Sequence, residues 1–280
     1  MVPLNDHRKR DATKPSLETF MKTLPFFAGL GTILFVITVC AFAEEPGYTD
    51  TPLIPGTPWR VHDQARPQPK IIAPGVGDLG TTPPNDAIVL FDGKNLDQWI
   101  RTDGKPIERG IQDGAFDIVQ TGQLRTKQEF GDFQLHIEWR PPELKEGFDR
   151  MNQGNSGLFL MGLFEIQIIE SKASYIYADG NAGAIYGQHP PMVNPARGPL
   201  EWQSFDVFFS TPKFDGETLK TPATTTVIYN GVLVHHCQQI FGTTQHREVP
   251  GRYPVSEKGP LTLQDHHSPV EFRNIWIRPL

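Results

Sequence analysis

Residues 133–142 read Phe-Gln-Leu-His-Ile-Glu-Trp-Arg-Pro-Pro. Apolar and polar side chains alternate through the first eight positions, which is the period of a half-buried β-strand. Two prolines then end the pattern, because proline has no N–H to offer to a sheet ladder. The stretch therefore predicts a strand at 133–140 with one apolar and one polar face.

Similar short apolar runs recur between residues 87 and 277 and are separated by turn residues. They lie at 87–91, 116–119, 157–159, 164–169, 205–209 and 272–277. Asn230-Gly231 between the runs 224–229 and 232–236 is the strongest short hairpin signal in the chain. Many short strands with turn signals predict an all-β fold, either a sandwich, a jelly roll or a barrel.

The composition excludes some partners. The 280 residues hold 26 Lys and Arg against 32 Asp and Glu, a formal net charge of −6. Nonspecific binding to nucleic acid needs basic patches, so we expect no nucleic-acid partner. The 26 glycines and 26 prolines indicate many turns and few long helices.

The N-terminal segment, residues 1–43, has the pattern of an export signal. Basic residues precede an apolar run at 24–43, which ends in Ala41-Phe42-Ala43. Cleavage after Ala43 would release the protein to the periplasm or the extracellular space. An uncleaved membrane anchor is the alternative, since twenty residues can span a bilayer. Cleavage would also remove Cys40 and leave Cys237 without a partner for an internal disulfide.

The exported part divides into two regions. Residues 44–84 contain nine prolines and little apolar periodicity, so they are interpreted as an extended leader or linker. Residues 85–280 hold nearly all of the strand patterns and are expected to form one domain. Two segments of that domain, 171–201 and 238–260, resist a strand interpretation and are predicted to be long functional loops.

Polar residues on and before the predicted strands are the candidate site. Glu165 and Gln167 share one face of a short strand, and a carboxylate there is a candidate acid or base. Asn155 and Ser156 lie in a polar Gly-flanked loop where a backbone can approach a ligand closely. Tyr186 lies in the first long loop.

A second candidate group precedes the last strand, where Gln264, Asp265 and His266 are consecutive. An aspartate can orient an imidazole, although sequence neighbours seldom bond in this way. Trp202, close to the first long loop, is the best candidate for an aromatic sugar platform. Histidines are frequent in the second half, but no recognised metal-ligand spacing occurs, so a metal site is left unknown.

On these residues the chain resembles the 3-keto-disaccharide hydrolase family. The resemblance covers about residues 87–280 in order. The matching stretches are 90–96, 124–127, 131–133, 138–140, 154–157, 164–168, 183–187, 201–202, 230–234, 263–266 and 273–280. The chain departs from the family pattern at His267-Ser268, where Gly-Asn is more usual, and at Phe164, where Tyr is common.

The resemblance implies a concanavalin A-like jelly-roll sandwich of two antiparallel sheets and an enzyme that cleaves glycosides oxidised at C3. A C3 ketone acidifies the C2 hydrogen, so a base can remove it and the glycosidic oxygen can leave from C1. Water then adds to the unsaturated sugar. Such a route needs a base, an acid for the leaving oxygen and stabilisation of the enolate, for which a divalent metal ion is one option.

We assign Glu165 or His266 as base and Asp265 as the residue that orients it or partly binds a metal. Asn155, Ser156, Gln167, Tyr186, Trp202 and Gln264 are assigned to the carbohydrate. An ordinary glycoside hydrolase and a lectin-like binding module stay open as alternatives, as does a structural envelope protein. An ordinary glycoside hydrolase would use two carboxylates. The usual Glu-x-Asp-x-Glu strand motif is absent here, because residues 165–169 read Glu-Ile-Gln-Ile-Ile. The oligomeric state is left unknown.

Overall fold

Strand β6 (Phe133–Arg140) forms where the alternation predicts it, in a computed structural model that describes residues 46–75, 79–108, 110–147 and 150–280. Its four odd-numbered residues, from Phe133 to Trp139, are fully buried. It pairs antiparallel with β10 (Gln203–Ser210) on one side and with β16 (Glu271–Pro279) on the other. The signal or anchor expected at 1–43 lies outside the described residues.

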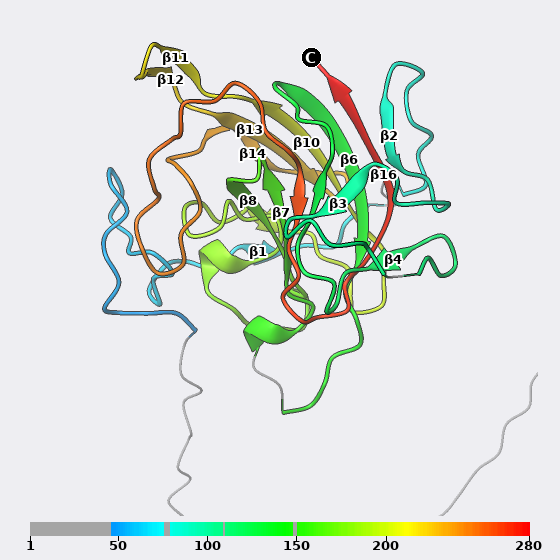
Figure 1. The fold of residues 1–280 in the computed structure, drawn as a ribbon. Coiled ribbons are helices and arrows are strands. Elements are labelled where there is room, and N and C mark those ends of the chain that lie inside the picture. The colour runs from blue at the N-terminus through cyan, green and yellow to red at the C-terminus, as the bar shows by residue number, and fades with distance from the viewer. Residues whose placement is uncertain (1–45, 76–78, 109, 148–149) are drawn as a thin grey trace, which may run out of the picture. The chain divides into compact units, whose positions relative to one another are not determined.

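These strands are the centre of a seven-stranded antiparallel sheet. The remaining strands are β2 (Ile88–Phe91), β4 (Phe116–Asp117), β13 (Thr224–Tyr229) and β14 (Val232–Gln239). The order is β14-β13-β10-β6-β16-β2, and β4 also pairs with β16. Figure 1 shows this sheet behind the shorter strands.

A second, five-stranded antiparallel sheet faces the first, in the order β3-β5-β15-β7-β8. Its strands are β3 (Trp99–Arg101), β5 (Leu124–Thr126), β7 (Ser156–Leu160), β8 (Phe164–Ile168) and β15 (Thr262–Leu263). The two sheets confirm the predicted all-β jelly-roll sandwich.

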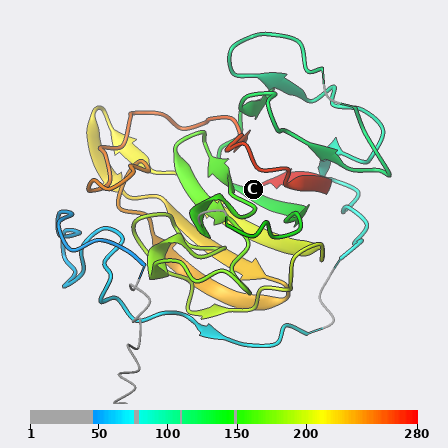
Figure 2. The ribbon, with the colours of Figure 1, turned by 90° about the horizontal axis from the view of Figure 1, so that it is seen from below.

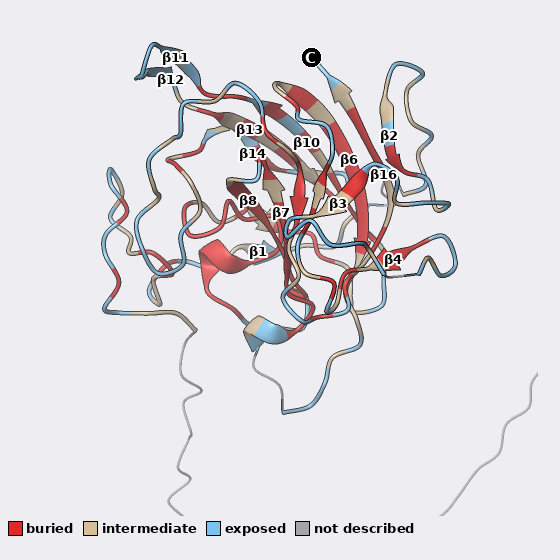
Figure 3. Cartoon of the chain, viewed as in Figure 1, coloured by how far each residue is buried: buried red, intermediate tan, exposed pale blue. Residues whose placement is uncertain are grey.

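The apolar core lies between the two sheets. Phe164 of β8 packs on Phe209 of β10 with ring centroids 5.9 Å apart, so the sheets are in direct contact. Leu158 of β7 and Ile166 of β8 are also fully buried. Figure 3 shows the buried residues concentrated on these central strands. Burial of this apolar surface is the main force that holds the sandwich together.

The Asn230-Gly231 turn joins β13 to β14 as predicted. Both residues have positive φ, 50° and 77°. A two-residue hairpin loop of this type requires a left-handed backbone at both positions, which asparagine and glycine tolerate best. Residues Lys213–Asp215 (β11) and Thr218–Thr221 (β12) form a separate small hairpin.

The proline-rich leader packs against the sandwich and does not behave as a free spacer. Its strand β1 (Lys70–Ile71) pairs in parallel with β9 (Val193–Asn194) of the first long loop. Farther along, the backbone N–H of Gly80 donates to the Glu138 carboxylate at 2.5 Å. Residues 44–280 accordingly form one compact unit, and Figure 2 shows the leader, in blue to cyan, following the outside of the sandwich.

The two long loops are ordered and cover one sheet. Residues 176–186 in the first loop are all buried, and they include the 3-10 turn η2 (Ala178–Gly180). A second 3-10 turn, η1 (Arg150–Asn152), precedes β7. Within the described parts of the chain, no helix is long and apolar enough to cross a membrane.

Candidate active site

Strand β8 is buried on both faces, which is unusual for a strand that carries Glu165 and Gln167. The alternation of β8 sends Phe164 and Ile166 into the core, so Glu165 and Gln167 point to the opposite side of the five-stranded sheet. Glu165 is only 4% exposed and Gln167 only 1% exposed. The long loops bury this polar face and make it the floor of a pocket.

The pocket has a volume of about 250 Å³ and contains six of the nine predicted site residues. Its lining consists of Asn155, Phe159, Glu165, Gln167, Tyr186, Thr244, His246, Gln264 and His266. These residues come from β7, β8, both long loops and the segment after β15. The fold therefore brings most of the predicted site residues together, although they span more than 100 residues of the chain.

The Glu165 carboxyl has no hydrogen-bond partner among the described residues. It lies over Gly157 of the neighbouring strand β7, where the missing side chain leaves the space that the carboxyl occupies. The backbone N–H of Glu165 donates to Thr244 Oγ1 at 2.9 Å, which ties β8 to the second long loop. Burial without a compensating charge raises the pKa of Glu165 to about 8, so both protonation states are accessible near neutral pH.

A tyrosine pair and a histidine form the pocket wall. The hydroxyls of Tyr177 and Tyr186 are 2.7 Å apart, and the Tyr186 hydroxyl is 3.1 Å from His246 Nδ1. Burial raises the pKa of Tyr186 far above its ordinary value, so this phenol stays protonated. Partial burial lowers the pKa of His246, helped by the nearby His62 and Arg247, which favours a neutral imidazole.

The side-chain amides of the pocket form only some of the hydrogen bonds available to them within the protein. Gln167 Oε1 accepts the backbone N–H of Ile168 at 3.0 Å. Gln167 Nε2 has no partner within the described residues and is available as a donor. Asn155 Nδ2 donates to the carbonyl of Met151 at 2.6 Å, which fixes the side chain at the pocket edge.

Two predicted residues support the pocket without lining it. The Asp265 carboxylate accepts the backbone N–H groups of Gly122 and His267, each at 2.9 Å. Asp265 was expected to orient the His266 ring directly. It instead fixes the turn that carries His266. Ser156 Oγ donates to the carbonyl of Gln264 at 2.8 Å, and Ser156 does not line the pocket.

Trp202, the predicted sugar platform, does not line this pocket. Its ring packs on the guanidinium groups of Arg140 and Arg273, at 4.8 and 4.0 Å from the ring centroid. Those arginines belong to β6 and β16 of the seven-stranded sheet, whereas the pocket lies on the five-stranded sheet. Arg140 follows the buried Trp139, so strand alternation puts it on the outer face of its sheet.

The sequence did not indicate Phe159, Thr244 or His246 as site residues. Phe159 belongs to an apolar run that predicts only core, but its β7 register places it opposite Glu165. Thr244 and His246 lie in the aperiodic loop 238–260, where no strand period fixes the direction of a side chain. The only available signal was the polar, Gly- and Pro-containing composition of that loop.

The histidines do not form a metal centre in the described parts of the chain. No three His, Cys, Asp or Glu side chains there lie close enough to hold an ion. His235 is buried, with Nε2 at 2.9 Å from the carbonyl of Gly183, and the adjacent His236 is exposed, as expected for neighbours on a strand. The donors present do not fit a cation that stabilises an enolate, and we derive no step through one.

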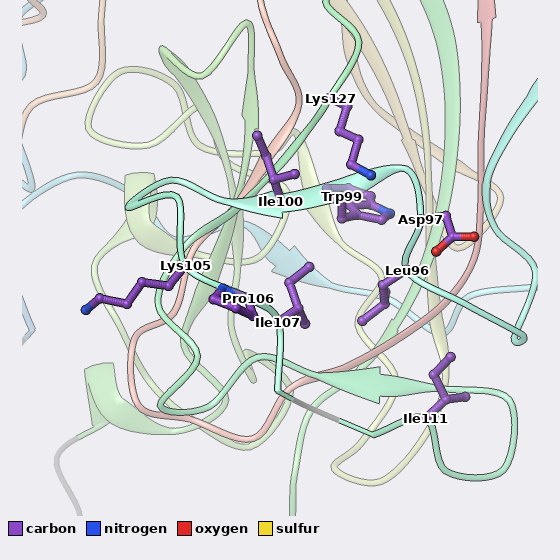
Figure 4. Close-up of a pocket in the computed structure, with 9 residues that line it drawn as sticks. All are labelled: Leu96, Asp97, Trp99, Ile100, Lys105, Pro106, Ile107, Ile111 and Lys127. Atoms are coloured by element: carbon purple, nitrogen blue, oxygen red, sulfur yellow. The ribbon is translucent and has the colours of Figure 1, made fainter.

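A larger pocket of about 440 Å³ lies elsewhere on the sandwich (Figure 4). It is lined by Leu96, Asp97, Trp99, Ile100, Lys105, Pro106, Ile107, Ile111 and Lys127. It holds none of the predicted site residues and no buried titratable group. The smaller pocket over β8 is therefore the better candidate active site.

Comparison with known proteins identifies the family of the folded domain. Residues 86–278 match the model of the 3-keto-alpha-glucoside-1,2-lyase-like domain. The chain belongs to this domain family. The matched stretch begins just before β2 and ends within β16, so it contains both sheets and every residue that lines the pocket. The leader lies outside it.

Solved structures of two proteins from Parabacteroides distasonis ATCC 8503, each named a "putative glycosyl hydrolase", are similar to this family member. The first is 40% identical, covers 77% of this chain and 93% of its own, and superimposes with a TM-score of 0.69. The second is 19% identical, covers 70% of this chain and 94% of its own with a TM-score of 0.52, and supports the fold alone. No curated protein matches the chain.

Proposed function

We propose that the protein is an exported enzyme that cleaves the glycosidic bond of 3-keto-glycosides, including 3-keto-disaccharides. Membership of the 3-keto-alpha-glucoside-1,2-lyase-like family supports the substrate class. The observation that carries the proposal is the Glu165 carboxyl, which is buried, has no hydrogen-bond partner in the described structure and lines a pocket of sugar-ring size.

The proposed reaction has two stages. A base removes the C2 proton, the electron pair of that C–H bond forms the C1–C2 double bond, and the C1–O bond breaks with its electrons on the departing oxygen. An acid protonates that oxygen and releases the aglycone. Water then adds its oxygen to C1 and a proton to C2, so the net change is hydrolysis.

Glu165 is assigned as the base at C2. A carboxylate in an apolar, partner-free setting is a stronger base than one in water, and the pKa of about 8 reflects this. The reaction rate is then expected to rise as the pH rises through this range, because the ionised fraction of Glu165 increases. The C3 ketone of the substrate supplies the acidity that an unoxidised sugar lacks.

The His266 imidazole, at the pocket edge, is assigned as the acid that protonates the leaving oxygen. His266 lines the same pocket as Glu165 and is exposed to solvent. Tyr186 remains protonated at neutral pH and donates from the wall toward the sugar oxygens. Gln167 Nε2 and the side chains of Asn155 and Gln264 complete the polar lining that would bind hydroxyl groups.

A conventional glycoside hydrolase is the second candidate, because the 40% identical relative is named as a glycosyl hydrolase. That mechanism needs two carboxyl groups about 5–10 Å apart across the scissile bond. Glu165 is the only carboxyl in the lining of the pocket as described. The elimination route, which does not need a second carboxylate, therefore suits this pocket better.

Proton abstraction can be tested directly in deuterium oxide. A 3-keto-disaccharide incubated with the protein should yield a 3-keto-glucose product that carries deuterium at C2, seen by mass spectrometry and NMR. Glu165→Gln, which keeps the size of the side chain, should lose both turnover and deuterium incorporation. Cleavage without C2 label would favour direct displacement at C1, and full activity of Glu165→Gln would remove Glu165 from the mechanism.

Export is proposed from the sequence of residues 1–43 alone. N-terminal sequencing of the protein recovered from its native cells distinguishes the two forms. A mature N-terminus at Glu44 would support a secreted or periplasmic enzyme, and an intact terminus in the membrane fraction would support an anchor. If the protein were instead a non-catalytic carbohydrate-binding module, it would bind sugar without turnover in either location.

A further inference from the structure

A buried carboxylate, that of Asp179 in η2, binds the leader to the pocket wall. Asp179 Oδ2 accepts the backbone N–H of His62 at 3.0 Å, and Asp179 Oδ1 is 3.1 Å from His62 Nδ1. Arg66 Nη1 lies 3.6 Å from Asp179 Oδ2. Asp179 and His62 are both 0% exposed.

Within the described residues, every polar partner of the Asp179 carboxylate thus comes from the leader. A buried carboxylate is costly unless its oxygens are bonded and its charge is paired. The loop that carries Asp179 would have to expose or neutralise this group if the leader were not docked. The buried form of residues 176–186 therefore depends on the leader.

The His62 ring is packed into the tyrosine pair of the pocket wall. Its centroid lies 4.1 Å from that of Tyr177 and 4.7 Å from that of Tyr186. His62 Nε2 is buried without a hydrogen-bond partner in the described structure, so the ring is held by Nδ1 and by packing. The backbone of His62 has φ 54°, a left-handed conformation that is uncommon for residues other than glycine.

Tyr186 connects this packing to the pocket. Its hydroxyl lies between the Tyr177 hydroxyl and His246 Nδ1, and both Tyr186 and His246 line the pocket with Glu165. Loss of the His62 ring would leave a cavity behind Tyr186 and allow the phenol to leave its place. A displacement of about 1 Å at such a group can reduce a reaction rate by about a hundredfold.

We infer that leader residues 46–66 hold the wall of the active site in place and that His62 is a positioning residue for Tyr186. The family domain begins at residue 86, so this contribution lies outside the matched domain. The activity arm of the test below depends on the proposed function, and the exchange arm does not.

His62→Asn in the full chain is the informative variant. Asparagine tolerates the left-handed backbone at this position, and its Nδ2 can replace His62 Nδ1 as donor to Asp179. The change therefore keeps the attachment of the leader and removes the ring that packs on Tyr186. Leu53→Ser, at a 55% exposed leader position that does not line the pocket, is the control.

The first arm measures turnover of a 3-keto-disaccharide in a double-mutant cycle with Tyr186→Phe. We expect His62→Asn to lower kcat at least tenfold and to change KM less than about threefold. In the Tyr186→Phe background, the same substitution should not lower kcat any further. Leu53→Ser should match the wild type. An unchanged kcat in His62→Asn, or an equal loss in both backgrounds, would overturn the inference.

The second arm uses hydrogen exchange detected by mass spectrometry and needs no substrate. Peptides that cover residues 174–187 should exchange faster in His62→Asn than in the wild type or in Leu53→Ser. Unchanged exchange in these peptides would overturn the positioning role. If the wild type cleaves no 3-keto-glycoside, the proposed function fails, and the exchange result alone decides whether the leader holds the pocket wall.

Discussion

The carboxyl of Glu165 occupies the space where a side chain at Gly157 would lie. A Cβ added to Gly157 would overlap Glu165 Oε1 and would come within 2.9 Å of the Phe159 ring. The two residues are diagonal neighbours on the antiparallel β7–β8 pair, where Gly157 pairs with Gln167 and Phe159 pairs with Glu165. The absence of a side chain on one strand thus sets the position of the candidate base on the next.

Gly157→Ala is therefore expected to displace the Glu165 carboxyl and lower kcat at least about tenfold. The backbone of Gly157 is not in the left-handed region, and the carboxyl is the flexible end of its side chain, so the cost in stability should be small. Steady-state kinetics and thermal unfolding measure the two effects. Gly75→Ala, at a glycine with open space around it, is the control. A fully active Gly157→Ala enzyme would contradict the placement of Glu165.

Glu165 should also make the stability of the protein depend on pH. The folded state raises the pKa from the ordinary 4.5 to about 8, so the native protein binds the proton more tightly than the unfolded chain. This contribution is fully present below pH 4.5 and is lost as the pH rises through 8, at most about 5 kcal/mol for this shift.

Denaturant unfolding at pH 5 and pH 8.5 tests this pH dependence. Between the two conditions the wild type should lose more stability than Glu165→Gln, whose side chain does not titrate. The exposed Glu217→Gln should behave as the wild type. Equal losses in the wild type and Glu165→Gln would show that the buried carboxyl does not have the raised pKa.

Tyr186→Phe removes the hydroxyl that links Tyr177 to His246 and keeps the aromatic ring. We expect kcat to fall at least about tenfold with little loss of stability, because a positioned donor in the pocket is lost. Tyr175→Phe, an exposed tyrosine in the same loop, is the control and should leave kcat unchanged. An unaffected Tyr186→Phe enzyme would exclude the hydroxyl from the reaction.

Trp202→Ala should leave substrate affinity and turnover unchanged and should destabilise the fold. The indole packs on Arg140 and Arg273, and two such contacts contribute about 1–2 kcal/mol together. Chemical denaturation measures the loss and isothermal titration calorimetry measures affinity for the sugar. A selective loss of sugar binding with intact stability would restore Trp202 as a platform.

The sandwich could be predicted from local patterns because strand alternation and turn chemistry are local properties. The alternation at 133–140 predicted β6, and Asn230-Gly231 predicted the β13–β14 hairpin. The more specific prediction of a concanavalin A-like sandwich came from the family resemblance and not from these patterns.

Part of the site was predictable because a strand fixes the direction of a side chain. Glu165 and Gln167 were found on one face of β8, because alternation leaves only two faces. His246 was missed because its position depends on the fold of an aperiodic loop and on a bond to Tyr186, 60 residues away. His62 was missed for the same reason, since its contact with Asp179 spans 117 residues and no local pattern encodes it.

The measurement that tests the central claim most directly compares 3-keto-trehalose with unoxidised trehalose as substrates of the purified protein, with products followed by mass. The account predicts that glucose is released from the keto-sugar alone, because only the C3 ketone makes the C2 proton removable by Glu165. Comparable cleavage of unoxidised trehalose, or binding without cleavage across a panel of 3-keto-glycosides, would contradict it.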